Sequence, residues 1–162
     1  MLKYQRIESI SEIYLVGKRM NMSFSNIKTP ILWKNFITRR KEIENTVGTD
    51  LFSVEVYKTA SFFENFDPSA DFEKWAAVKA SDFKDIPSEM ETLIIPPGKY
   101  AVFNYIGKGS DSSKAYQSII QDWFPTSKYQ MDHRPHFAVM GEKYKNEDPN
   151  SEEELWFPII PK

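Results

Sequence analysis

The chain has 162 residues, a length that fits a single domain over 1–162, and its 41% hydrophobic and 27% charged content is typical of a globular protein. It contains no cysteine, which excludes disulfides and cysteine-ligated zinc, and its 21 basic and 23 acidic residues give a net charge of −2, which argues against nucleic acid as a partner. No apolar run resembles a signal peptide or a membrane helix, so we expect a cytoplasmic protein with no membrane partner.

The first half of the sequence predicts a strand, a helix and two more strands. Ile13–Val16 is apolar and β-prone, and Gly17 after it is a candidate β-bulge. Thr29-Pro30 is a favourable helix start because Thr caps the first turn and Pro suits the first helical position, and Gly48 supplies a helix stop. The expected elements are a strand within 7–22, a helix over 30–47, and strands over 51–58 and 72–80.

The second half repeats this order of elements. Gly107-Lys108 follows a strand just as Gly17-Lys18 does, which suggests an internal duplication with repeats at about 7–80 and 98–160. Two such β-α-β-β units predict an α+β fold, in which two helices pack on an antiparallel-rich sheet and a ligand groove lies between the halves. The expected elements are strands over 91–95, 100–106, 136–140 and 155–160, and a helix that begins at Asp111 or Ser112 and ends at Pro125.

Aromatic residues make up 15% of the chain, more than a core of this size needs. The excess suggests an aromatic-lined cavity or an adhesive surface, and the alternative is an aromatic-rich core. For each ring taken alone, core packing is the simpler interpretation, but together some of them are candidates to line a ligand cavity. The candidates are Trp33, Phe36, Tyr105, Tyr116, Trp123 and Trp156.

Three phenylalanines, Phe62, Phe63 and Phe66, lie in the predicted loop 59–71. Rings in a loop can anchor it to the core, cover a pocket or form a surface for a protein partner. The sequence leaves these three roles open.

The C-terminal segment is the most informative candidate site. In a strand, Glu154, Trp156 and Pro158 share one side, and the apolar residues Leu155 and Phe157 share the other. If both sides are covered, Glu154 is drawn beside a Trp into a poorly solvated place, where it can attract a cationic ligand or act as a general base. The alternative is a solvated acidic run ahead of an edge strand.

Asp132-His133-Arg134-Pro135-His136 holds the only two histidines. We expect no metal, because a third ligand is missing, and no Asp-His catalytic dyad, because no serine motif accompanies it. Pro135 is expected to start a strand with His136 at its edge. Gly107-Lys108-Gly109-Ser110 lacks the complete phosphate-loop pattern and is expected to be a turn.

The ordered segments of the second half resemble a known family. Gly98–Phe103, then Trp123-Phe124-Pro125, then Asp132–Phe137 and finally Glu154–Ile159 are similar to the gyrase-inhibitor-like (GyrI-like) small-molecule-binding domain, the effector-binding module of some bacterial multidrug-responsive transcription activators. The resemblance is clearest over 98–160, and the first half agrees in its order of elements.

The resemblance implies a duplicated strand–helix–strand–strand fold that binds amphipathic, often cationic, organic compounds between its halves, with Glu154 as the ligand-contacting glutamate. The chain shows no helix-turn-helix, so we expect a stand-alone binding protein without a cofactor rather than a complete activator. Two alternatives follow from stand-alone relatives: a hydrolase of reactive cyclic compounds that uses Glu154, or a gyrase-inhibitor-type protein that acts on a protein partner.

Overall fold

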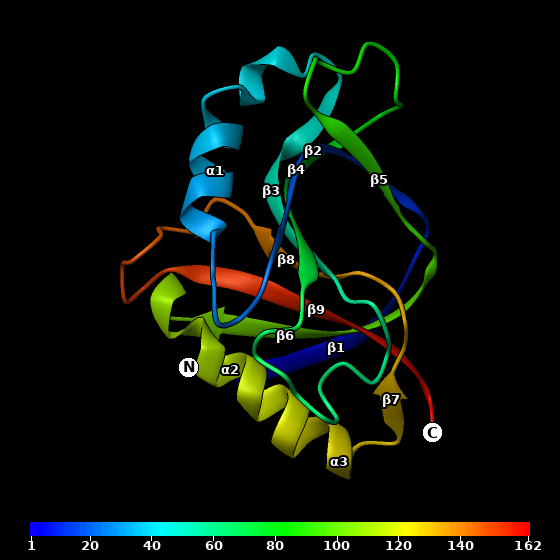
Figure 1. The fold of residues 1–162 in the computed structure, drawn as a ribbon. Coiled ribbons are helices and arrows are strands. Elements are labelled where there is room, and N and C mark those ends of the chain that lie inside the picture. Colours follow the sequence, from blue (N-terminus) through cyan, green and yellow to red (C-terminus); the bar gives the residue numbers. More distant parts are fainter.

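The computed structural model describes all of residues 1–162 as a large antiparallel sheet with helices on one of its faces (Figure 1). This arrangement confirms the predicted α+β class. None of the helices is long and apolar enough to cross a membrane. The strands are β1 (Leu2–Ile10), β2 (Ile13–Met22), β3 (Thr46–Val56), β4 (Phe72–Ala80), β5 (Glu91–Ile95), β6 (Gly98–Ile106), β7 (Tyr129–Met131), β8 (His136–Met140) and β9 (Glu152–Pro161).

Helix α1 (Thr29–Ile37) follows β2, and a longer helical segment follows β6. That second segment comprises α2 (Ser112–Ser118), a π-helical stretch (Ile119–Trp123) and α3 (Phe124–Thr126). It therefore runs as one rod with a widened middle, and it ends one residue after Pro125, as a proline in the last turn favours.

The strand order is β1-β6-β9-β8-β3-β4-β2-β5, with β7 paired to β9 outside this path. Outward from the central β3–β8 pair, the strands β4 and β2 on one side match β9 and β6 on the other. In sequence, α1 lies between β2 and β3 of the set β2, β3 and β4. The helical segment α2–α3 lies between β6 and β8 of the set β6, β8 and β9, as the proposed duplication requires. The duplication itself stays a prediction from the sequence.

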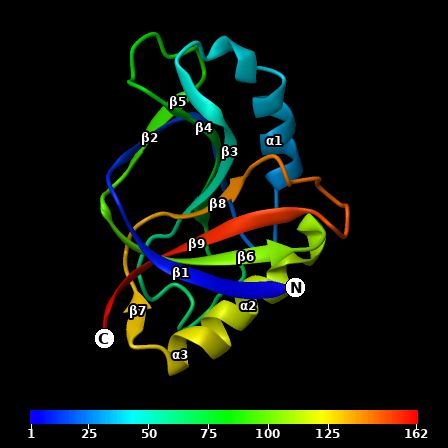
Figure 2. The same ribbon diagram turned by 180° about the vertical axis from the view of Figure 1, so that it is seen from behind.

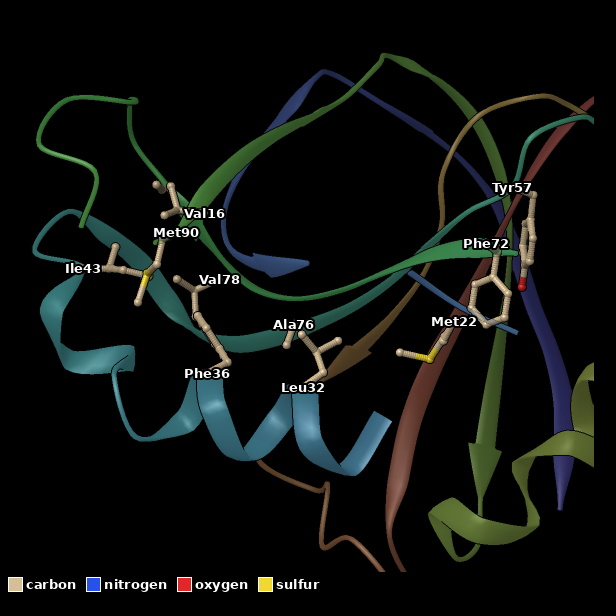
Figure 3. Packing of buried hydrophobic residues seen from close by; sticks show 11 residues of the cluster. Val16, Met22, Leu32, Phe36, Ile43, Tyr57, Phe72, Ala76, Val78 and Met90 are labelled. Carbon is tan, nitrogen blue, oxygen red and sulfur yellow. The ribbon is translucent and has the colours of Figure 1, made fainter. Parts of the chain in front are cut away.

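Both helices pack on the same face of the sheet, which we call the helix face. Ala76, Ser53, Ala138 and Leu155 are neighbours across four adjacent strands and therefore point to one side. Ala76 belongs to the core under α1, together with Leu32 and Phe36 (Figure 3), whereas Leu155 belongs to the core under α2. The two helices thus cover the two halves of one face and leave the central strands between them.

A third core fills the opposite, helix-free face. Trp75, Val54, Phe137, Trp156 and Val102 form one row of strand neighbours on that face. The same core includes Leu15 and Ile95 from the far end of the sheet, because the sheet curls (Figure 2). The space inside the curl is therefore occupied by side chains, which cover the helix-free face of the central strands.

Two predictions for the first half were wrong. The helix predicted over 30–47 ends at Ile37, and after a 3-10 turn at Arg40–Glu42 the chain enters β3 at Thr46, where it pairs with β4. Gly48 does not stop a helix but lies within β3 with φ 75°, where the register with β4 shifts. β-Branched Thr46, Val47 and Thr49 favour this strand over the helix that periodicity alone predicted.

Gly17 is not at a bulge either. The register of β2 with β4 runs without interruption through Gly17 and Ala77. A Cβ atom at Gly17 would lie 2.0 Å from the backbone oxygen of Ala76. This position therefore needs glycine for close approach of two strands rather than for a bulge.

Candidate functional site

The centre of the helix face, between the two helix-covered cores, carries polar side chains. Lys74, Glu55 and His136 are successive neighbours on β4, β3 and β8 and all point to this face. Tyr57 directly follows the last residue of β3, and its ring lies 4.9 Å from the His136 ring, on the same side as Glu55. We call this group, together with Tyr116 of α2 and Glu153 of β9, the central polar strip.

Glu55 is almost fully buried, with 7% of its surface exposed, and one of its oxygens is satisfied. Lys74 Nζ donates to Glu55 Oε1 at 3.0 Å. Oε2 has no hydrogen-bond partner. The only other buried side-chain nitrogen or oxygen without a partner is Arg134 Nη1. Burial raises the pKa of Glu55, and Lys74 opposes that rise. A carboxylate oxygen left unpaired in a protein interior is costly, so Glu55 Oε2 is a buried acceptor whose hydrogen-bonding capacity is unused.

Glu153 is the second carboxylate of the strip and lies half-buried on β9. Burial raises its pKa to about 7, Lys74 lowers it and the nearby Glu55 carboxylate raises it further. Near neutral pH this side chain therefore exchanges readily between its protonated and ionised forms.

His136 is the first residue of β8, directly after Pro135 as predicted, and it lies at the centre of the sheet because β8 pairs with β3 and β9. Its ring meets the rings of Tyr57 and Phe157 edge-on, with centroid distances of 4.9 Å and 5.3 Å. Burial lowers its pKa to about 3, and the positive charge of Arg134 and His133 acts in the same direction. The imidazole is therefore neutral at physiological pH.

Two tyrosines complete the strip. Tyr57 is buried and its pKa is raised, mainly by burial and also by Glu55. Tyr116 packs its ring against Phe157 at 5.6 Å, and its pKa is raised by burial and then by the charges of Glu55 and Glu153. Tyr116 thus lies within electrostatic reach of both carboxylates and brings α2 to the strip.

Glu154 and Trp156, the residues singled out from the sequence, point to the helix-free face. The Glu154 carboxylate pairs with Arg6 Nη1 at 3.3 Å and accepts a hydrogen bond from Trp156 Nε1 at 3.2 Å. Arg6 also lies over the Trp156 ring, 5.4 Å from its centroid. Both oxygens of Glu154 therefore have partners within the chain.

The same arrangement occurs on β4. Glu73 accepts a hydrogen bond from Trp75 Nε1 at 2.8 Å and pairs with Arg19 at 3.5 Å. Each of the two Glu-x-Trp segments thus joins a carboxylate to the indole two residues later and to an arginine from another strand. This repetition is consistent with a structural role for Glu154.

Of the remaining predicted site residues, only Tyr116 joins the strip. Trp33 and Phe36 pack together in and around the core under α1, with ring centroids 6.0 Å apart. Tyr105 donates its hydroxyl to the carbonyl of Lys108 at 2.8 Å. Trp123 stacks on Tyr4 at 5.5 Å. The structure therefore does not bring the seven predicted residues together.

The histidine segment makes hydrogen bonds that connect two strands. Asp132 accepts hydrogen bonds from the backbone of His133 and from Arg134 Nε, whereas His133 Nε2 lies 3.0 Å from the carbonyl oxygen of Tyr57. The segment thus ties the start of β8 to the end of β3. No three His, Cys, Asp or Glu side chains are placed to hold one metal ion.

An acidic depression of about 360 Å³ lies at the rim of the sheet beside Glu153. Glu153 is the one residue that belongs both to this depression and to the central polar strip. The half-buried carboxylate therefore has a route to solvent that is lined by negative charge. The other lining residues are Asp50, Asn104, Val139, Gly141, Glu142, Lys143, Glu152 and Glu154.

Comparisons with known proteins agree with this architecture. The sequence profile of the GyrI-like small molecule binding domain matches residues 5–160. The EcmrR C-terminal domain superposes with a TM-score of 0.69 at 17% identity, covering 98% of this chain and 99% of that one. SAV2435 bound to tetraphenylphosphonium superposes with a TM-score of 0.68 at 15% identity, covering 98% and 94%.

A third similar structure is a hydrolase from Listeria innocua, with a TM-score of 0.60 at 12% identity and coverage of 96% and 91%. At these identities the structures show a shared fold. No sequence among curated proteins matches significantly.

Proposed function

Since the chain belongs to the family of GyrI-like small-molecule-binding domains, we propose that it binds amphipathic organic cations at the central polar strip, with Glu153 and Glu55 facing the positive charge. The observation that carries this proposal is the unpaired, buried Oε2 of Glu55 beside a second carboxylate whose pKa lies near neutrality. An entering cation supplies the missing partner of Glu55 and favours ionisation of Glu153.

The charge balance of the strip supports a cation. Lys74 neutralises the ionised Glu55, and protonated Glu153 adds no charge, so the strip carries no net charge when Glu55 is ionised and Glu153 is protonated. When a cation enters, Glu153 can release its proton and balance the added charge. A site of this kind avoids an unpaired buried charge in both states.

The aromatic neighbours fit the apolar part of such a ligand. Tyr57 and Tyr116 present rings at the strip, and ring faces attract cations as well as other rings. The ligand in the SAV2435 structure, tetraphenylphosphonium, combines one positive charge with four phenyl groups. A ligand of that chemistry suits two carboxylates flanked by tyrosines.

Titration calorimetry with tetraphenylphosphonium tests the proposal. The variant Glu153→Gln is expected to weaken binding about tenfold, since it removes one ion pair worth about 1.4 kcal/mol. Glu154→Gln is the matched control, because it changes the adjacent carboxylate on the opposite face. If Glu154→Gln weakens binding and Glu153→Gln does not, the sequence-based assignment of Glu154 as the ligand contact holds instead; no binding by the wild-type protein would refute the function.

Hydrolysis is the second candidate, and the near-neutral pKa of Glu153 is the observation that favours it. A carboxyl group with a pKa near 7 is suited to take a proton from water at neutral pH. The similar structure described as a hydrolase from Listeria innocua supports this candidate, because it has the same fold. In this case Glu153→Gln would abolish turnover of a reactive cyclic substrate while binding of that substrate persists.

A further inference from the structure

The loop between β3 and β4 closes one end of the central polar strip. Phe62 and Phe63 turn back onto Tyr57, with ring centroids 4.6 Å and 4.9 Å from the Tyr57 ring. Phe63 also lies 6.4 Å from the His136 ring. Two loop side chains therefore cover the end of the strip that Tyr57 and His136 form.

The loop is held mainly by its rings. Its hydrogen bonds through the backbone run within the loop, except one from Ser25 N to the carbonyl of Pro68 at 2.9 Å. Phe66 stacks on Phe63 and meets Phe24 edge-on, while nearly half of each of the Phe66 and Phe24 surfaces stays exposed. Apolar contacts in a loop with a single backbone hydrogen bond to the rest of the protein can slide and repack, so the rings can adjust to molecules of different size.

The charge of the loop favours the same kind of ligand as the strip. Residues 59–71 include Glu64, Asp67 and Asp71 and no basic residue. Negative charge around an aromatic surface raises the local concentration of cations. The loop thus combines ring faces, which attract aromatic groups and cations, with carboxylates that attract positive charge.

We propose that Phe62 and Phe63 determine the specificity of the ligand site by forming an adjustable aromatic wall, which selects cations with aromatic rings over cations with alkyl chains. This inference rests on the proposed function. It assigns to the phenylalanine-rich loop the covering role among the three roles that the sequence left open.

The test compares two cations of equal charge, tetraphenylphosphonium with aryl groups and tetrabutylammonium with alkyl groups. Leucine keeps the apolar character of phenylalanine but removes the ring face, so Phe62→Leu with Phe63→Leu is expected to weaken tetraphenylphosphonium binding about tenfold and tetrabutylammonium binding less than about twofold. Phe83→Leu is the matched control, because Phe83 is a half-buried ring that packs on Tyr14, away from the strip. It should change neither affinity.

The outcomes separate the two proposals. If the wild-type protein binds both cations and the double variant weakens both equally or neither, the aromatic wall is refuted while the binding function stands. If the wild-type protein binds neither cation, the proposed function fails and this inference fails with it. Should the double variant not fold, as judged by its thermal transition, Phe63→Leu alone carries the same test with an expected loss of about threefold.

Discussion

Glu55 and His136 are directly opposed across the central β3–β8 pair, and both side chains are buried on the helix face. Burial acts on them in opposite senses, since it raises the pKa of the carboxyl group and lowers that of the imidazole. In each case burial favours the uncharged form. The middle of the sheet therefore holds two ionisable groups whose pKa values change on folding.

His136 is expected to make the fold sensitive to acid. Between pH 6.5 and about 3 the unfolded chain binds a proton at this residue and the folded protein does not, so the free energy of unfolding falls as the pH is lowered through this window. The loss attributable to His136 should reach about 3 kcal/mol by pH 4. The free energy of unfolding, measured with urea from pH 7 to pH 4, should fall less steeply for His136→Leu than for the wild-type protein. An unchanged slope in His136→Leu, or an equal effect of His133→Gln, would contradict the prediction.

Glu153 acts on stability with the opposite sign. Its pKa is raised from 4.5 to about 7 on folding, so between these values the folded protein holds a proton that the unfolded chain releases. The free energy of unfolding should therefore decrease as the pH rises from 4.5 to 7, by about 2 kcal/mol from this group. Glu153→Gln, which cannot ionise, should gain stability relative to wild type at pH 8 but not at pH 5. Equal differences at the two pH values would argue against a buried, protonated Glu153.

Cation binding should be linked to one proton. If the ionised form of Glu153 is the one that binds, the affinity for tetraphenylphosphonium rises about tenfold between pH 6 and pH 8, because ionisation of a group with a pKa near 7 is nearly complete over that range. Calorimetry in two buffers of different ionisation heat measures the proton released. Glu153→Gln should bind more weakly and with no dependence on pH, whereas Glu154→Gln should keep the wild-type profile.

The Glu55–Lys74 pair should couple strongly in a double-mutant cycle. Lys74→Met leaves a buried carboxylate without its ion-pair partner and is expected to cost about 3 kcal/mol. Glu55→Leu combined with Lys74→Met removes both charges and should cost clearly less than the sum of the single changes. Denaturant unfolding of the four proteins gives the coupling energy. Additive effects would mean that the two charges are solvated rather than buried.

Gly17 should tolerate no side chain. Gly17→Ala places a methyl group 2.0 Å from a backbone oxygen that cannot move without shifting β4, so we expect a loss of at least about 3 kcal/mol or failure to fold. Gly109→Ala is the comparison, because its nearest neighbour is the end of the flexible Glu147 side chain at 3.3 Å. Thermal denaturation should therefore separate the two variants widely, and similar transitions would be inconsistent with the close strand packing.

Much of the fold follows from local pattern. Alternating residues correctly predicted β3 and β4 in their central parts, and Thr29-Pro30 marks the start of α1. The end of α1 was not predictable in this way. The segment after Ile37 retains helical spacing, but its conformation is decided by pairing of Thr46 with Ala80, which lies far along the chain.

The candidate site was harder to predict because the sequence of a strand that is covered on both sides does not indicate which side faces the central polar strip. Glu153 and Glu154 are adjacent, and a shift of one residue exchanges the two faces. Only the register with β8 and β3 places Glu153 on the side of Glu55, and that register depends on contacts distant in sequence. The sequence did place Glu55 between Ser53 and Tyr57 on the polar side of a predicted strand. This pattern indicates a candidate site only when that side is known to be buried.

The outer strands have a consequence for how the chain folds. β1 precedes β2 in sequence but pairs with β6, and β5 precedes β6 but pairs with β2 (Figure 1). Each half of the sheet is therefore completed by an outer strand that is next to the other half in sequence. Neither half can then assemble its full sheet before the other is present. Such reciprocal exchange favours an all-or-none transition and disfavours a stable half-molecule, and it delays completion of the sheet until the entire chain is available.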